Sequence, residues 1–208
     1  MNIDHIVITA PDLDTGAEAV HEALGVAPVQ GGKHSLMGTH NRLLSLGPDM
    51  YLEVIAVDPD APDPGRPRWF AMDRFSGPPR LTNWAAQADD MTRALAEAPM
   101  GMGELTSLTR GDLSWQMAIP PSGELPFDGV LPMLLSWQGR TAADLLSPSG
   151  CRLQRLILTH PRAGDIRTAW PRLAATDRLQ IEVGPQPGLA AEIATPEGLK
   201  TLSGVIGN

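Results

Sequence analysis

The sequence has one cysteine, few basic residues and no long apolar stretch. Cys151 has no partner for an internal disulfide, so the fold must rest on an apolar core, and a reducing compartment fits. Lys and Arg number 16 against 24 Asp and Glu, and no basic cluster interrupts the net charge of -8. Because this field repels the phosphates of nucleic acids and anionic membrane surfaces, we expect neither as a partner.

Signals for export, membrane insertion and two catalytic classes are absent as well. The opening stretch MNIDHIVITAPDLD has no basic segment followed by a long apolar one, so we expect no signal peptide and a cytoplasmic protein. No uninterrupted apolar run approaches the roughly 20 residues of a membrane helix. Neither a glycine-rich phosphate loop at a helix start nor a Gly-x-Ser-x-Gly elbow occurs, so neither phosphate-loop nor serine-hydrolase chemistry is indicated.

The apolar and turn-forming residues that are present predict a repeated order of elements. At 208 residues, 42% of them hydrophobic and 19% charged, the chain can bury a core of its own. A strand, a helix that ends at Gly25 and three apolar runs give the order βαβββ (3–10, 15–24, 34–39, 41–46 and 50–57). After a proline-rich link with a short apolar helical turn at 69–72, the order returns (81–87, 90–98, 105–109, 113–119 and 131–137). A shorter copy follows (153–159, 163–174, 179–183 and 189–195).

We therefore predict an α+β protein that forms one compact unit. It comprises a first βαβββ module at 1–58, a connecting segment at 59–80, a second βαβββ module at 81–140 and a partial third βαββ module at 151–208. Sequence identity between the copies is low. The prediction depends on the order of elements and on the acidic turns around Asp12 and Asp90 that open the first two helices.

Two stretches of the first module resemble a known family. DHIVITAPDLD, and GGKHSLMGTHNRLLSLG followed by YLEVI, are similar to glyoxalase-like domains of the vicinal oxygen chelate superfamily, which includes glyoxalases, bleomycin resistance proteins and extradiol dioxygenases. The residues that carry the similarity are Asp4-His5, Gly31-Gly32, His34, Gly38-Thr39, Asn41 and Tyr51-Leu52-Glu53. The resemblance implies paired modules that form half-barrels around a concave pocket. It also implies a lyase, isomerase or related enzyme for a small oxygen-rich organic molecule, as a monomer or a homodimer.

The resemblance further implies where a metal would bind. In the superfamily the ligands come from the first and last strands of each module, which assigns His5 and Glu53 to a site for a divalent ion such as Zn, Ni, Fe or Mn. His34 is the candidate for an additional ligand. Alignment of the helix-opening turns puts Asn83 opposite His5, and the fourth strand of the second module puts Ser136 near the place of Glu53. Neither Asn83 nor Ser136 is a good ligand for a transition metal, so the second module departs from the metal pattern.

The residues around Glu53 support a second interpretation without a metal. Leu52 and Val54 share one face of a strand, so Glu53 points to the other face. If that face is inside, the carboxylate needs a raised pKa, a histidine partner or a cation, and His5 is the obvious partner. Such a pair can act as a general base on an acidic C–H or O–H bond during isomerisation or lyase chemistry. The alternative is a pair that only holds two strands together.

Neutral polar and aromatic residues are candidates for binding the ligand. Thr39 and Asn41 alternate onto one face beside His34, and Gly38 removes a side chain where something must come close. The competing interpretation is a bulged hairpin in which Thr39 and Asn41 satisfy backbone groups. The candidates on strands expected to line the second concave face are Asn83, Trp84, Ser136 and Trp137.

Two functions of different kinds are therefore compatible with the sequence. One is a glyoxalase-like enzyme in which His5 and Glu53 are the base or the metal-holding pair. The other is a protein of the same fold that sequesters a small molecule without changing it, and the weak ligands of the second module favour it. A third class, a subunit that only mediates assembly, stays open.

Overall fold

The computed structural model describes residues 1–206 and contains both predicted βαβββ orders. The first runs through β1 (Asn2–Thr9), α1 (Leu13–Leu24), β2 (Val29–His34), β3 (Thr39–Ser45) and β4 (Tyr51–Val57). A connecting segment with the short helical turn η1 (Trp69–Arg74) leads to β5 (Arg80–Gln87), α2 (Met91–Glu97), β6 (Glu104–Arg110), β7 (Leu113–Ile119) and β8 (Met133–Trp137). The remaining elements are η2 (Ala143–Leu145), β9 (Arg152–His160), α3 (Ala163–Ala169), α4 (Pro171–Ala174), β10 (Leu179–Val183), β11 (Gly188–Thr195) and β12 (Gly198–Val205).

The acidic turns start the first two helices as the sequence predicts. The carboxylate of Asp12 accepts a hydrogen bond from the backbone N–H of Thr15 at 2.8 Å, and that of Asp90 accepts one from Arg93 at 2.9 Å. Each bond satisfies a backbone donor that has no partner inside the helix. Helix α1 ends at Gly25, whose φ of 74° is the left-handed conformation that glycine adopts without strain.

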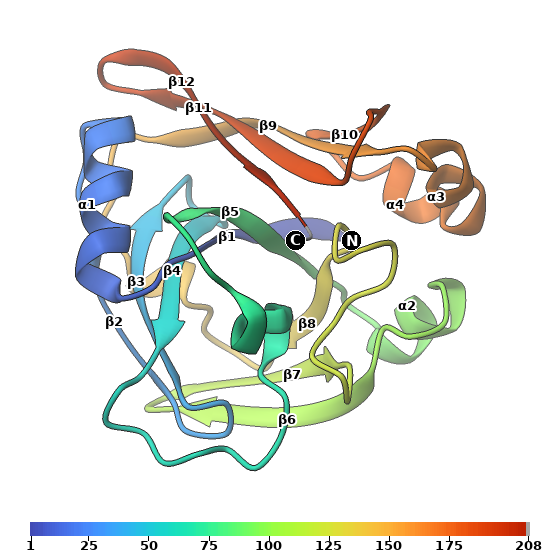
Figure 1. Cartoon of the computed structure of the whole chain (residues 1–208), viewed down its shortest axis with the longest axis horizontal. Coiled ribbons are helices and arrows are strands. Elements are labelled where there is room, and N and C mark those ends of the chain that lie inside the picture. Colours follow the sequence, from blue (N-terminus) through green and yellow to red (C-terminus); the bar gives the residue numbers. More distant parts are fainter. Residues whose placement is uncertain (207–208) are drawn as a thin grey trace.

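One eight-stranded sheet contains both modules. Its strand order is β2-β3-β4-β1-β5-β8-β7-β6, with β1 parallel to β4, β5 parallel to β8, and β1 antiparallel to β5 where the modules join. Figure 1 shows this sheet curling around a central space, with α1 along one side. The curl brings the two edge strands, β2 and β6, into contact although they are farthest apart in the strand order. The predicted α+β fold with half-barrel modules is confirmed.

The C-terminal segment forms a second sheet that covers β1 and β5 from outside the curl. Its strand order is β10-β9-β11-β12, and β11 and β12 pack on β5 (Figure 1). The predicted order strand, helix, strand, strand is present, and β12 adds a strand that the sequence pattern did not indicate. The pairing differs from that of the first two modules, because β9 is parallel to the next strand β10. The predicted helix at 163–174 is two helices, since Pro171 has no N–H to continue the first one.

The hairpin between β2 and β3 also differs from the prediction. The predicted strand at 34–39 is wrong: β2 ends at His34, and the backbone N–H groups of Met37 and Gly38 donate to the His34 carbonyl at 3.0 and 2.9 Å to form a turn. Gly38 adopts a φ of 59°, which is why a glycine stands there. The Gly31-Gly32 pair lies within β2, at a shift in register, and not in a turn.

No helix among residues 1–206 is long and apolar enough to cross a bilayer.

His160, at the end of β9, is 2% exposed, and its Nε2 lies 2.9 Å from Asp128 Oδ2 in the loop before β8. The backbone N–H of Arg162 donates to His160 Nδ1 at 2.9 Å, so Nε2 carries the proton that Asp128 accepts. This hydrogen bond ties the second sheet to the loop that leads into β8.

Candidate active site

Four neighbouring strands bring a buried polar cluster together on the concave face. His5 on β1, His34 at the end of β2, Asn41 on β3 and Glu53 on β4 come from the adjacent strands of the first module. The Nε2 atom of His5 lies 3.5 Å from Glu53 Oε2, and Asn41 Nδ2 donates a hydrogen bond of 2.6 Å to Glu53 Oε1. His5 and Glu53 are 4% and 5% exposed. The two residues that the sequence singled out thus lie side by side.

His5 is held as an imidazolium. Its Nδ1 lies 2.7 Å from Asp4 Oδ1, and its ring stacks on Tyr51 with centroids 4.5 Å apart. Burial alone would lower the pKa of His5, but hydrogen bonds to Asp4 and Glu53 and the charges of both carboxylates outweigh it and raise that pKa to about 9. Asp4 also accepts a hydrogen bond from Trp137 Nε1 at 2.8 Å. The pairing of β1 with β5 shifts register between Ile3 and His5, at the position of Asp4.

Glu53 is held as a carboxylate. Burial alone would raise its pKa, but the hydrogen bond and charge of His5, with His34 and Asn41, outweigh burial and lower the pKa of Glu53 to about 2. Of the three possibilities that the sequence left for a buried Glu53, the structure shows the histidine partner. The resting pair is therefore an ion pair over a wide range of pH.

His34 is neutral, and its hydrogen bonds define its tautomer. Burial and the positive charge of Arg110 lower the pKa of His34 to about 4, against the opposing effect of Glu53. Arg110 Nη1 lies 3.1 Å from His34 Nε2 and can only donate, so Nε2 is the acceptor. The proton then sits on Nδ1, which donates to Thr39 Oγ1 at 3.0 Å. Thr39 and Asn41 thus both orient groups of the cluster.

Arg110 is the functional residue that the sequence did not reveal. It stands at the end of β6 in the second module, yet its guanidinium lies 3.1 Å from His34 Nε2 and 3.4 Å from Asn41 Oδ1. The contact exists because the curl of the sheet joins its two edges. A Cβ atom at Gly32 would lie 2.7 Å from Arg110 Cδ, so the second glycine of the Gly31-Gly32 pair leaves room for this side chain. The Gly31-Gly32 pair is a signal that could have indicated this close approach, but it does not identify the partner.

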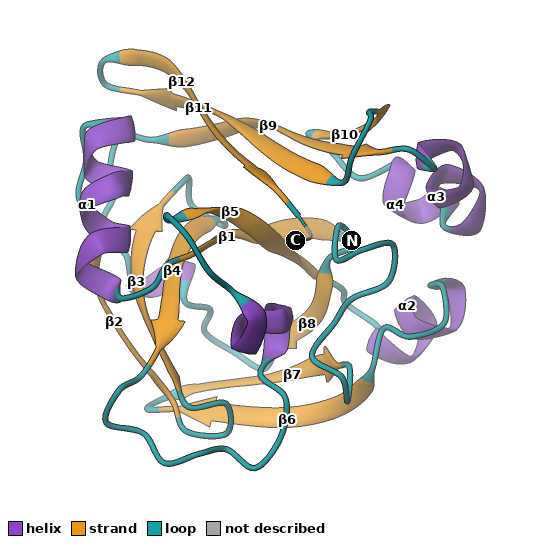
Figure 2. Cartoon of the chain, in the orientation of Figure 1, coloured by secondary structure: helices purple, strands orange, loops and turns teal. Residues whose placement is uncertain are grey.

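The cluster faces a small cavity with an aromatic wall. The cavity has a volume of about 30 Å3, enough for roughly two water molecules. Its lining residues are His5, His34, Asn41, Tyr51, Glu53, Trp69, Phe70, Arg110, Trp115, Met117, Leu135 and Trp137. Trp69 and Phe70 belong to η1, the short helix in the mouth of the curled sheet in Figure 2. This helical turn therefore closes the site.

Three of the predicted second-module residues lie elsewhere. Trp84 is fully buried and donates to the Val130 carbonyl at 2.9 Å, and Asn83 lines a separate, larger cavity. Ser136 points away from the polar cavity, because its neighbours Leu135 and Trp137 both line it.

The strand register agrees with one of the two predicted equivalences between the modules and contradicts the other. His5 pairs with Ala85 and Val7 with Asn83, so the two-fold relation between the modules places Asn83 at the position of His5, as predicted. Glu53 pairs with Val7, and Met133 pairs with Ala85, so the same relation places Met133 at the position of Glu53. The predicted equivalence of Ser136 and Glu53 is wrong. An apolar side chain stands where a second carboxylate would.

These residues do not fit a divalent metal ion, although superfamily members often use one. Within residues 1–206, no three His, Cys, Asp or Glu side chains are arranged to hold an ion. His5 is protonated and has a carboxylate near each ring nitrogen, while His34 Nε2 accepts from Arg110. A metal would have to displace the proton of His5 and the hydrogen bond from Arg110 to His34, against the charge of the guanidinium. Both imidazoles are thus already occupied by protons and hydrogen bonds of the protein.

The fold and the arrangement of paired modules are those of the vicinal oxygen chelate superfamily. Within it the chain belongs to the glyoxalase-like domain family, which matches residues 3–174. A solved structure of a hypothetical protein from Staphylococcus aureus is 14% identical and has the same fold, with a TM-score of 0.61 over 89% of this chain and 87% of that one. No curated protein matches the chain.

Two further solved structures have lower TM-scores. A methylmalonyl-CoA epimerase from Mycobacterium tuberculosis is 17% identical, with a TM-score of 0.45 over 70% of this chain and 92% of that one. A variant of the Streptomyces coelicolor methylmalonyl-CoA epimerase in complex with 2-nitronate-propionyl-CoA is 17% identical, with a TM-score of 0.45 over 67% of this chain and 96% of that one.

Proposed function

We propose that the chain is an enzyme that moves a proton on a small organic anion with adjacent oxygen atoms, and that it does so without a metal. The observation that carries the proposal is the ionised carboxylate of Glu53 on the wall of a cavity that also contains the guanidinium of Arg110. A carboxylate base and a fixed cation in one small cavity suit the removal of a proton next to a carbonyl or carboxylate group.

The roles follow from the atoms that face the cavity. Arg110 binds an oxygen of the substrate anion, and Glu53 accepts a proton from the adjacent carbon. The C–H bonding pair moves onto the substrate oxygen, where Arg110 stabilises the charge, and return of the proton from Glu53 to carbon completes an isomerisation. Near neutral pH a carboxyl of pKa about 2 is a weak base. A bound anion raises the pKa of Glu53, because like charges disfavour the ionised form.

The remaining polar residues of the cluster position Glu53 and Arg110. His5 and Asn41 orient the carboxylate of Glu53 through contacts of 3.5 and 2.6 Å. His34 accepts a hydrogen bond from Arg110 and is itself fixed by Thr39. The aromatic wall excludes water, which strengthens each electrostatic contact inside the cavity.

Substrate entry requires movement of η1. A volume of about 30 Å3 holds water but no organic molecule, and Trp69 and Phe70 occupy the space between the cluster and the mouth. Phe70 and Ala71 have φ values of 58° and 53°, a left-handed backbone that is costly for residues with a Cβ atom.

The second candidate function is sequestration of the same kind of anion without chemistry. It is favoured by the resting charges: a pKa of about 9 for His5 and of about 2 for Glu53 keeps both groups charged through the neutral range. A fixed pair of charges suits binding, whereas a general base works best with a pKa near the working pH.

Hydrogen exchange in deuterium oxide separates the two functions. We expect the protein to exchange the C–H hydrogen of one or more members of a panel of small 2-oxo and 2-hydroxy carboxylates, followed by proton NMR. Glu53→Gln should slow the exchange at least about 100-fold, as expected for loss of a general base. Glu22→Gln, the same change at an exposed position on α1, should leave the rate unchanged. A panel member that raises the melting temperature without exchange would favour sequestration, and exchange that survives in Glu53→Gln would refute the assignment of the base.

A further inference from the structure

A second, larger cavity lies next to the polar one. Its volume is about 530 Å3, within the range of roughly 300 to 1,000 Å3 for sites that bind small organic molecules. Phe70 of η1 lines both cavities and separates them. The other walls come from the beginning of β5, the loop at 124–129 and the end of β12.

The larger cavity combines apolar walls with a cation that has no acidic partner. The Arg80 guanidinium stacks on the ring of Phe75 at 4.5 Å and donates to the backbone carbonyl of Ser76 at 2.7 Å. Within residues 1–206, Arg80 forms no ion pair with an acidic side chain, whereas nearby Arg74 is neutralised by Glu124. In a chain of net charge -8, an unneutralised guanidinium on a cavity wall indicates a site for an anion.

A buried amide adds a neutral polar group to the same wall. Asn83 is 4% exposed, and its Nδ2 donates a long hydrogen bond of 3.4 Å to the carbonyl of Gly129. Buried amides usually form shorter bonds, so this one is poorly satisfied by the protein. A ligand oxygen in the cavity can provide the missing partner.

The walls of this cavity are held in a costly backbone conformation. Phe127 in the loop before β8 has a φ of 53°, as unfavourable as that of Phe70 across the cavity, and Asp128 beside it has a φ of 57°, which aspartate adopts more readily. Asp128 is fixed by its hydrogen bond with His160, and Phe127 by the Arg162 guanidinium 5.1 Å from its ring. Strain that is kept in place by such contacts is typical of ligand sites and not of accidental gaps.

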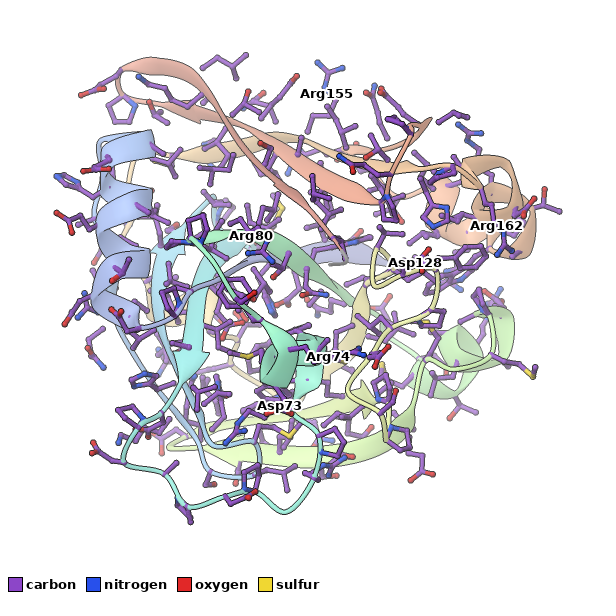
Figure 3. All side chains as sticks on the ribbon, in the orientation of Figure 1. Asp73, Arg74, Arg80, Asp128, Arg155 and Arg162 are labelled. Atoms are coloured by element: carbon purple, nitrogen blue, oxygen red, sulfur yellow. The ribbon has the colours of Figure 1, made fainter. Side chains whose placement is uncertain are left out.

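We propose that this second cavity binds an organic anion, with its aliphatic or aromatic body between Phe70, Leu125 and Val205 and its acidic group toward Arg80. Figure 3 shows Arg80 where β5 begins, Arg74 at the end of η1 and Asp128 in the loop before β8. Binding there requires no proton transfer to Glu53, so the inference goes beyond the proposed function and can hold or fail without it.

The dye 8-anilinonaphthalene-1-sulfonate, an aromatic anion, is a direct probe of the site. We expect the folded protein to bind one dye molecule per chain, measured by fluorescence titration. Val205→Trp places a bulky side chain at the cavity wall from a position that is 45% exposed, so it fills the site without disturbing the core. It should weaken dye binding at least about tenfold. The matched control Val183→Trp lies on β10 at 73% exposure, away from the cavity, and should change binding less than about twofold.

The role of the Arg80 charge is tested by separate substitutions. Arg80→Gln should weaken dye binding about tenfold and Arg80→Lys by less, because a cation near the acidic group is retained. Glu22→Gln, which removes a negative charge on the exposed face of α1, should bind the dye like the wild type. Circular dichroism melts check that each variant is folded. The proposal is overturned if the folded protein binds no dye, or if Val205→Trp and Arg80→Gln bind it as tightly as the wild type.

Discussion

Replacing Glu53 with Gln removes one charge from the buried cluster and keeps its shape. The pKa of Glu53 is lowered from 4.5 to about 2, and this difference corresponds to about 3 kcal/mol of stability at a pH where the unfolded carboxyl is ionised. The glutamine can still accept from Asn41, but it leaves the His5 imidazolium with Asp4 as its carboxylate partner. We expect Glu53→Gln to lower the free energy of unfolding by about 3 kcal/mol at pH 5.5.

The loss of unfolding free energy in Glu53→Gln should become smaller at both low and high pH. The depressed pKa of Glu53 stabilises the fold above pH 4.5, and this contribution disappears as the pH falls from 4.5 toward 2. The raised pKa of His5 stabilises the fold below pH 6.5, and this contribution disappears as the pH rises from 6.5 toward 9. The difference between wild type and Glu53→Gln should therefore be largest between these ranges and should shrink on either side.

Urea unfolding followed by tryptophan fluorescence, from pH 4 to 9.5, measures this profile. Glu192→Gln is the matched control, because Glu192 forms a part-exposed ion pair with Arg155 at 2.8 Å on the second sheet. Its loss should cost at most about 1 kcal/mol. A Glu53→Gln cost no larger than that of the control, or one that does not vary with pH, would contradict the buried ion pair.

Two further substitutions test the groups around this pair. Arg110→Met removes the cation at 3.1 Å from His34, so the pKa of His34 should rise from about 4, which NMR titration of the ring measures; an unchanged pKa would mean that the contact does not form in solution. Gly31→Ala places a Cβ atom 2.1 Å from Asn41 Oδ1 and should destabilise the fold by about 2 kcal/mol or more in thermal unfolding. Gly164→Ala in α3 meets nothing within 4 Å and should be neutral or stabilising by about 0.5 kcal/mol; equal effects of the two changes would refute the packing argument.

The closure of the sheet explains why the candidate site draws on both modules. His5, His34, Asn41 and Glu53 come from one module, but the cation that faces them is supplied by the other. The second module also supplies the apolar wall residues Trp115, Met117, Leu135 and Trp137. Met133 stands at the position that corresponds to Glu53. The internal repeat has therefore kept its backbone arrangement while the two copies carry different chemistry.

Local patterns determined the parts of the site that lie on neighbouring strands. Alternation in YLEVIAV sets which way Glu53 points, and the resemblance to a known family implied the adjacent strands that bring it to His5. The hairpin was misplaced by a few residues, because Gly31-Gly32 resembles a turn but serves to make room for Asn41 and Arg110. Periodicity does not distinguish these two uses of glycine.

The sequence by itself determined the α+β class and the repeated βαβββ order, and its resemblance to a known family implied the pairing of His5 with Glu53. Only the tertiary structure decided that Arg110 completes the cluster, that η1 closes it and that a second cavity lies behind Phe70. These features depend on how strongly the sheet curls and on how a long connection folds back into its mouth. The curl of the sheet and the path of the connection both result from many small packing interactions. They therefore cannot be predicted from any short stretch of the chain.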